Sequence, residues 1–120
     1  IEDFIKENSN TVLLDVRTEN EWNSLGKPKA EDLNSKTYFV TVSHDLSNWQ
    51  VPDQNFIVNV KKKIDKDKKI LVMCAAGGRS MIAANLLENE GYSVLNVSDG
   101  YSGNSQDPGW KKSNLPVDNS

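Results

Sequence analysis

The chain has 120 residues, of which 37% are hydrophobic and 26% are charged, and its formal net charge is −3. This length suffices for one hydrophobic core, so we expect a single domain over residues 1–120. The small net charge favours neither a nucleic acid nor an anionic membrane as partner. No apolar run reaches the roughly 20 residues that span a bilayer, and no signal peptide is visible. We expect a cytoplasmic protein of bacterial type, although a start at Ile1 is also compatible with a removed leader.

Apolar residues at helical spacing predict an amphipathic helix over residues 1–8, and a compact apolar run predicts a buried strand over 11–16. Thr18 and Glu21 have the spacing of a capping box, which predicts a helical turn over 18–23. A loop over 26–34 follows. β-Branched and aromatic residues then predict a second strand over 37–42.

In the second half of the chain the pattern predicts a helix over 53–64 and a third strand over 70–73. The clearest helix covers 79–90 and ends before Gly91, which we expect to be its C-cap. A fourth strand is predicted over 93–97, then a loop over 99–108 and a helical turn near Trp110. Met73 and Met81 are interpreted as core residues.

Alternating strands and helices predict an α/β fold with a central parallel sheet and helices on both faces. Open sheets of this kind bind ligands beyond the carboxyl ends of their strands. Three segments are expected at that edge: residues 15–17, 43–52 and 74–80.

The only cysteine, Cys74, and the only histidine, His44, limit the possible chemistry. A single cysteine excludes an internal disulfide and the multi-cysteine metal sites. A histidine-based nucleophilic catalyst would need His44, which stands in a polar loop and is interpreted as a surface residue.

Cys74 stands between a predicted hydrophobic strand and a predicted helix. The residues that follow it have little or no side chain, so we expect their backbone N–H groups to be able to bind an anion. These residues are Ala75, Ala76, Gly77 and Gly78. A helix N-terminus and a cation such as Arg79 both favour the thiolate, which is the nucleophilic form of cysteine. Ser80 is placed to cap the helix. We therefore interpret Cys74 as a nucleophile in an anion-binding loop rather than as an inert core cysteine.

The loop sequence CAAGGRS, residues 74–80, resembles the C-x-x-G-x-R-S active-site loop of the rhodanese family. Residues 14–17 (LDVR) with Glu21 and Trp22 resemble the upstream D-V-R-x-x-x-E-[WF] motif, and segments 97–100, 109–110 and 115–116 resemble the closing motif. The resemblance implies a rhodanese-like fold. It also implies transfer of sulfane sulfur from a small anionic donor such as thiosulfate to a thiophilic acceptor (cyanide, a thiol or a protein) through a Cys74 persulfide. No metal or organic cofactor is implied.

Three further residues are candidates around this loop. Arg79 is expected to orient the donor and stabilise the departing sulfite, or else to hold the loop through carbonyls or a carboxylate. Arg17 either adds positive potential near the loop or, as we favour, joins Asp15 and Glu21 in ion pairing that fixes a turn. Trp49, in a polar loop beyond a strand, is a candidate pocket residue.

Two other functions compete with sulfur transfer. Rhodanese-fold relatives include cysteine phosphatases and arsenate reductases, but the phosphatase loop is C-x-x-x-x-x-R, whereas Cys74 and Arg79 enclose one residue fewer. The second alternative is a non-catalytic interaction module or a sulfur relay partnered by another protein. The intact Cys74 argues against the inactive version but leaves the relay open.

Overall fold

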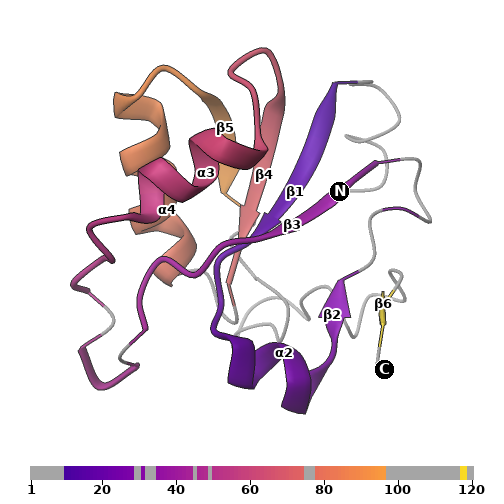
Figure 1. The fold of residues 1–120 in the computed structure, drawn as a ribbon, viewed down its shortest axis with the longest axis vertical. Helices are drawn as coiled ribbons and strands as arrows, with labels where there is room; N and C mark the ends of the chain where they lie inside the picture. The colour runs from indigo at the N-terminus through magenta and orange to yellow at the C-terminus, as the bar shows by residue number, and fades with distance from the viewer. Residues whose placement is uncertain are drawn as a thin grey trace.

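The computed structural model describes residues 10–28, 31, 35–44, 46–48, 50–74, 78–96 and 117–118. Its main feature is a four-stranded parallel sheet with strand order β3-β1-β4-β5, and β2 and β6 form a separate antiparallel pair (Figure 1). The expected helix over 1–8, the expected loop over 99–108 and the expected turn near Trp110 lie outside the described residues. The described segments confirm the α/β class.

The elements follow in this order: β1 (Thr11–Asp15), α2 (Glu19–Leu25), β2 (Lys27–Pro28), β3 (Thr37–Phe39), the 3₁₀ helix η2 (Leu46–Asn48), α3 (Phe56–Lys63), β4 (Lys69–Met73), α4 (Gly78–Asn89), β5 (Ser93–Asn96) and β6 (Val117–Asp118). All four strands of the main sheet were predicted, although β3 ends three residues earlier than expected. The short β2–β6 pairing was not predicted, since residues 26–34 were interpreted as a loop.

Side chains alternate between the two faces of the sheet, and α3 and α4 share one face. Their buried residues join those of β1 and β4 in one cluster that includes Val12, Leu14, Phe56, Val60, Ile70, Val72, Ala83 and Leu87. On the other face Leu13, Leu71 and Met73 are equally buried. There α2 contributes Trp22, which packs edge-to-face on Phe39 at 5.1 Å between ring centroids. Helices therefore contact both faces, with α3 and α4 on the same one.

The helix ends follow local rules. Thr18 caps α2, and the reciprocal bonds of the predicted capping box with Glu21 are present. Gly91 has a φ of +96°, the left-handed conformation that a helix C-cap favours, as predicted.

Met81 is 58% exposed, so its assignment to the core was wrong. The buried stripe of α4 runs through Ser80, Ala83 and Leu87, and Met81 is rotated about 100° away from it.

The parallel register brings the carboxyl ends of β1 and β4 to one edge of the sheet. Asp15 is opposite Met73, and the Val16 N–H donates to the Met73 carbonyl at 2.9 Å. In Figure 1, α2 lies at the lower end of the sheet, where β1 ends. The segments that follow β1 and β4 are therefore neighbours, although they are far apart in the sequence.

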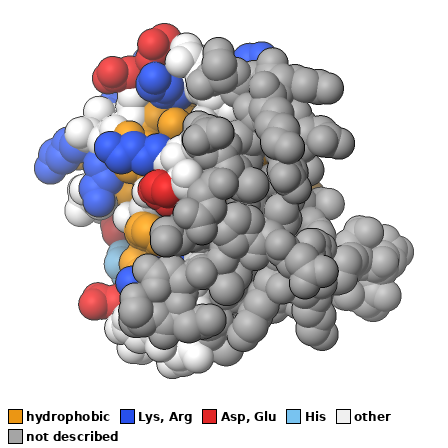
Figure 2. Space-filling model, turned by 90° about the vertical axis from the view of Figure 1, so that its right-hand side faces the viewer, with side chains coloured by type: hydrophobic (Ala, Val, Ile, Leu, Met, Phe, Trp, Pro, Cys, Tyr) orange, Lys and Arg blue, Asp and Glu red, His pale blue; other side chains and the backbone are white. Residues whose placement is uncertain are grey.

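Basic side chains gather on one part of the described surface (Figure 2). Helix α3 ends in Lys61, Lys62 and Lys63, all exposed, and Lys61 pairs with Glu90 at 2.9 Å. Cations in the last turn of a helix interact favourably with its dipole.

None of the described helices is long and apolar enough to cross a bilayer.

Tyr92 ties the segment after α4 to the end of α3, because its hydroxyl donates to the Ile64 carbonyl at 2.7 Å in a buried position. We expect Tyr92→Phe to lower the free energy of unfolding by about 1 kcal/mol, the usual contribution of a neutral hydrogen bond. Urea unfolding measures the change. Tyr38→Phe is the matched control and should alter stability by less than half as much, and equal losses in both variants would contradict the assignment.

Candidate active site

Cys74 immediately follows β4 and is 1% exposed. It belongs to the buried cluster on the α3–α4 face, on the same side of the strand as Val72. Its thiol donates a hydrogen bond to the hydroxyl of Ser80, with 3.6 Å between sulfur and oxygen. The cysteine therefore stands at the carboxyl edge of the sheet, with its sulfur facing the first turn of α4.

Ser80 is fully buried, and its hydroxyl in turn donates to Oδ1 of Asn96. The expected capping role of Ser80 was wrong, because α4 already begins at Gly78 and Ser80 lies inside the helix. Asn96 was not singled out from the sequence. It ends β5 opposite Val72 and is half-buried. Strand alternation was the available signal, since it places Asn96 on the same face as Val72 and Cys74.

Arg79 forms a bidentate ion pair with Glu21. The distances are 2.6 Å from Nη1 to Oε1 and 2.8 Å from Nη2 to Oε2, and the two side chains are 10% and 13% exposed. The expected grouping of Glu21 with Asp15 and Arg17 was therefore wrong. Two roles were predicted for Arg79: to bind the donor, or to hold the loop through a carbonyl or carboxylate. The structure shows a contact to a carboxylate, that of Glu21 in the upstream motif.

The pair fixes the charge of both partners. Burial raises the pKa of Glu21, but hydrogen bonds from Arg79 and Thr18 together with the Arg79 charge outweigh it, so this pKa lies below its usual value. The hydrogen bond to Glu21 raises the pKa of Arg79 against the effect of burial, and the charges of Glu21, Cys74 and Asp15 add to the rise. A permanent cation is therefore held within electrostatic range of Cys74.

Arg17 is fully buried and pairs with Asp15, as predicted. Its Nε lies 3.1 and 3.0 Å from the two carboxylate oxygens, and Nη2 donates to Asp15 at 2.8 Å and to the Gly26 carbonyl at 2.8 Å. The hydroxyl of Thr41 donates to the Arg17 carbonyl at 2.8 Å. Arg17 thus links the end of β1 to both the end of α2 and the segment after β3, which favours the structural one of its two expected roles.

Of the remaining residues considered in the sequence, the structure describes Gly78 and His44. Gly78 is exposed and opens α4. Ala75, Ala76, Gly77 and Trp49 lie outside the described residues. His44 is 68% exposed and bonds Asp53 at 2.8 Å, in agreement with its interpretation as a surface histidine.

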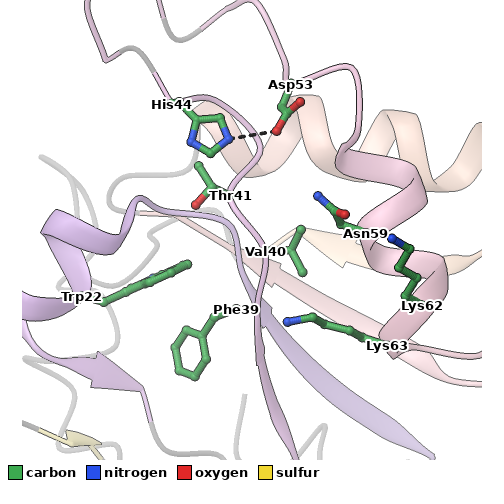
Figure 3. A pocket seen from close by; sticks show the side chains of 9 residues that line it. All are labelled: Trp22, Phe39, Val40, Thr41, His44, Asp53, Asn59, Lys62 and Lys63. Atoms are coloured by element: carbon green, nitrogen blue, oxygen red, sulfur yellow. Dashed lines mark hydrogen bonds and ion pairs between the residues drawn. The ribbon is translucent and has the colours of Figure 1, made fainter.

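A cavity of about 310 Å³ lies at the edge of the sheet beside β3. Figure 3 shows Trp22 and Phe39 on one side of it and side chains of α3 on the other. Its described lining consists of Trp22, Phe39, Val40, Thr41, His44, Asp53, Asn59, Lys62 and Lys63. Cys74, Ser80 and Arg79 are not among these described lining residues.

The family model for the rhodanese-like domain matches residues 2–107 of this chain. This match covers both the Glu21 motif and the Cys74 loop, and it agrees with the parallel sheet and the position of the cysteine at its carboxyl edge. The chain belongs to the rhodanese-like domain family, which confirms the resemblance found in the sequence.

The chain is 42% identical over 110 residues to uncharacterized protein RP600 of Rickettsia prowazekii. The aligned segment covers 91% of this chain and 84% of the relative. It is 41% identical over 118 residues to uncharacterized protein RC0915 of Rickettsia conorii, covering 95% and 88%. The crystal structure of Rv0390 from M. tuberculosis matches with a TM-score of 0.82 at 26% identity, over 98% of this chain and 91% of that one. A rhodanese-like domain protein from Staphylococcus aureus shares the fold, with a TM-score of 0.62 at 19% identity, over 97% and 89%.

We expect Glu21→Gln to lower the free energy of unfolding at neutral pH by about 1–3 kcal/mol, because a charged hydrogen bond to a mostly buried Arg79 is lost. Since the pKa of Glu21 is lower in the folded chain, its ionised form stabilises the fold above the unfolded value of about 4.3. This contribution disappears as the pH falls through the lowered folded pKa. The difference between wild type and Glu21→Gln should therefore shrink on acidification.

Urea unfolding at neutral pH and at several lower values measures this difference. Glu19→Gln provides the control, because Glu19 is exposed in the same turn of α2. Removal of its charge should change stability by less than about 0.5 kcal/mol. A gap between wild type and Glu21→Gln that stays constant down to acidic pH would contradict the charged pairing.

Proposed function

We propose that the protein is a sulfurtransferase that carries sulfur as a persulfide on Cys74. The observation that supports it most is the setting of the only cysteine. Cys74 directly follows the interior strand β4, and its thiol forms a hydrogen bond with Ser80 in the first turn of α4. Arg79, the residue before Ser80, remains cationic. Family membership and the cysteine loop motif support the same activity.

In the first half-reaction the Cys74 thiolate attacks the outer sulfur of thiosulfate. A bond forms between Sγ and that sulfur, the sulfur–sulfur bond of the donor breaks, and sulfite departs with the bonding electron pair. The enzyme is left as an anionic persulfide. This is covalent catalysis in which one difficult transfer is split into two simpler ones.

In the second half-reaction a thiophilic acceptor attacks the outer sulfur of the persulfide. With cyanide, thiocyanate leaves and the Cys74 thiolate is regenerated. A thiol or a protein acceptor would take the sulfur in the same way. Residues 1–120 hold no second thiol that could resolve the persulfide.

Arg79 is proposed to stabilise the anionic donor and the departing sulfite. Guanidinium carries five N–H donors, and the two contacts with Glu21 engage only two of them. Glu21 can thus hold Arg79 in a fixed orientation while other N–H groups of Arg79 remain for the donor. The anion-binding loop expected from the small residues at 75–78 is part of this proposal.

Cys74→Ser is expected to abolish transfer of sulfur from thiosulfate to cyanide, because serine at this position lacks the nucleophilic sulfur. Thiocyanate formation measures turnover, and circular dichroism checks that the variant is folded. Mass spectrometry of the wild type after thiosulfate treatment should show one additional sulfur atom, absent from Cys74→Ser. Substantial thiocyanate formation by the folded variant would refute the mechanism.

The wild type should not hydrolyse aryl phosphates. A transferring phosphoryl group spreads charge over three equatorial oxygens, and a loop with one residue fewer than the phosphatase loop offers fewer amides to them. Each missing partner costs about 1–3 kcal/mol. Both activities are to be assayed on the wild type and on a variant with one glycine inserted between Gly77 and Gly78. The insertion should weaken sulfur transfer, and robust phosphatase activity in the wild type would favour the competing function.

A further inference from the structure

The cavity beside β3 has two chemically different walls. On one side the half-buried rings of Trp22 and Phe39 pack edge-to-face, 5.1 Å apart between centroids. On the other side α3 presents Asn59, Lys62 and Lys63. In Figure 3 the ammonium end of Lys63 points into the cavity, toward the aromatic side. An apolar wall that faces a cationic wall suits a molecule with an apolar body and an anionic group.

The two lysines of the cavity have no counter-charge among the described residues. Lys61, which precedes them in α3, pairs with Glu90 at 2.9 Å. No ion pair between described residues involves Lys62 or Lys63. A bound anion would therefore be attracted by both ammonium groups.

The described lining contains one carboxylate, that of Asp53, and both of its oxygens have partners. Oδ2 lies 2.8 Å from Nε2 of His44, and Oδ1 accepts from the Asn55 N–H at 2.9 Å. In Figure 3 this pair stands at the upper end of the cavity, whereas Lys63 stands at the lower end. Among the described lining residues, none places a negative charge at the Lys63 end.

The backbone of the segment after β3 adds a hydrogen-bond donor. The N–H groups of Val40 and Val42 donate inward, to the Asp15 and Val16 carbonyls at 3.1 and 3.2 Å. Because successive N–H groups of an extended chain alternate in direction, the Thr41 N–H between them points away from β1. No described residue accepts from it. Since Thr41 lines the cavity, this donor is available to a bound carboxylate.

We propose that the cavity binds a small aromatic carboxylate, whose ring packs on Trp22 and Phe39 and whose carboxylate pairs with the lysines of α3. The volume of about 310 Å³ is at the lower end of the range for small-molecule sites, so the ligand has one or two rings. Binding there needs no sulfur transfer, and it gives the face between α2 and α3 a role beyond the proposed function.

The probe is 2-naphthoate, titrated into the wild type at neutral pH while NMR follows the backbone amide signals. The signals of Phe39 and Thr41 should move with a dissociation constant of about 1 mM or lower. The neutral isostere 2-naphthamide should bind about fivefold more weakly, because it cannot pair with the lysines. Acetate, which lacks the ring, should leave the signals in place at the same concentrations. Equal binding of naphthoate and naphthamide, or no binding of naphthoate, would overturn the proposal.

A pair of double variants tests the lysines. Lys62→Gln combined with Lys63→Gln should weaken naphthoate binding about fivefold. Lys61→Gln combined with Lys66→Gln removes the same charge from two exposed lysines outside the described lining, and should weaken binding by less than about twofold. Equal weakening in both double variants would show a general effect of net charge and would refute the site.

Circular dichroism checks that the variants are folded, and all four lysines are exposed. If either double variant does not fold, Lys63→Gln replaces the first and Lys61→Gln the second, with the same order of effects expected. The comparison of naphthoate with naphthamide needs no substitution, so it decides the charge requirement in either case.

Cys74→Ser separates this site from the proposed sulfur transfer. Naphthoate should bind this variant as it binds the wild type, because Cys74 is not among the described lining residues. Loss of naphthoate binding in the folded variant would place the anion at the cysteine and would overturn the assignment. Failure of the sulfurtransferase assay with naphthoate binding intact would refute only the proposed function, and active sulfur transfer without naphthoate binding would refute only the cavity ligand.

Discussion

The bidentate bond between Glu21 and Arg79 joins two segments that are 58 residues apart in the sequence. One carboxylate accepts from four donors there, because Glu21 Oε1 also accepts from the backbone N–H and the hydroxyl of Thr18, each at 3.1 Å, in addition to the two Arg79 contacts. The same side chain thus completes the cap of α2 and fixes the first turn of α4. Ser80, which contacts Cys74, is the next residue of that turn.

The parallel sheet supplies the second constraint. Strand β4 lies between β1 and β5, so the residue that follows it is flanked by the ends of both neighbours. On the β1 side stands the buried pair of Asp15 and Arg17. On the β5 side stands Asn96. Cys74 thus follows a core strand whose two neighbours both end in polar residues, while its own side chain belongs to the buried cluster.

Sequence patterns predicted the elements that carry local signals. The apolar runs that form β1 and β4, the capping box at Thr18 and the positive φ at Gly91 are all set by neighbours in the chain. The two-residue pairing of β2 with β6 has no such signal, because its partner is remote. The partner of Glu21 was missed for the same reason: Arg17 is close in sequence, whereas Arg79 is close only in the folded chain.

The position of β4 also determines how the site responds to local opening of the fold. A strand with hydrogen-bonded neighbours on both sides exchanges its amide hydrogens only through large opening events. Met73, the last residue of β4, is fully buried, and Cys74 is 1% exposed. Fraying at the edge strands β3 and β5 would therefore leave the sulfur attached to the most protected part of the sheet. Oxidants that reach thiols through partial unfolding should therefore attack this cysteine slowly.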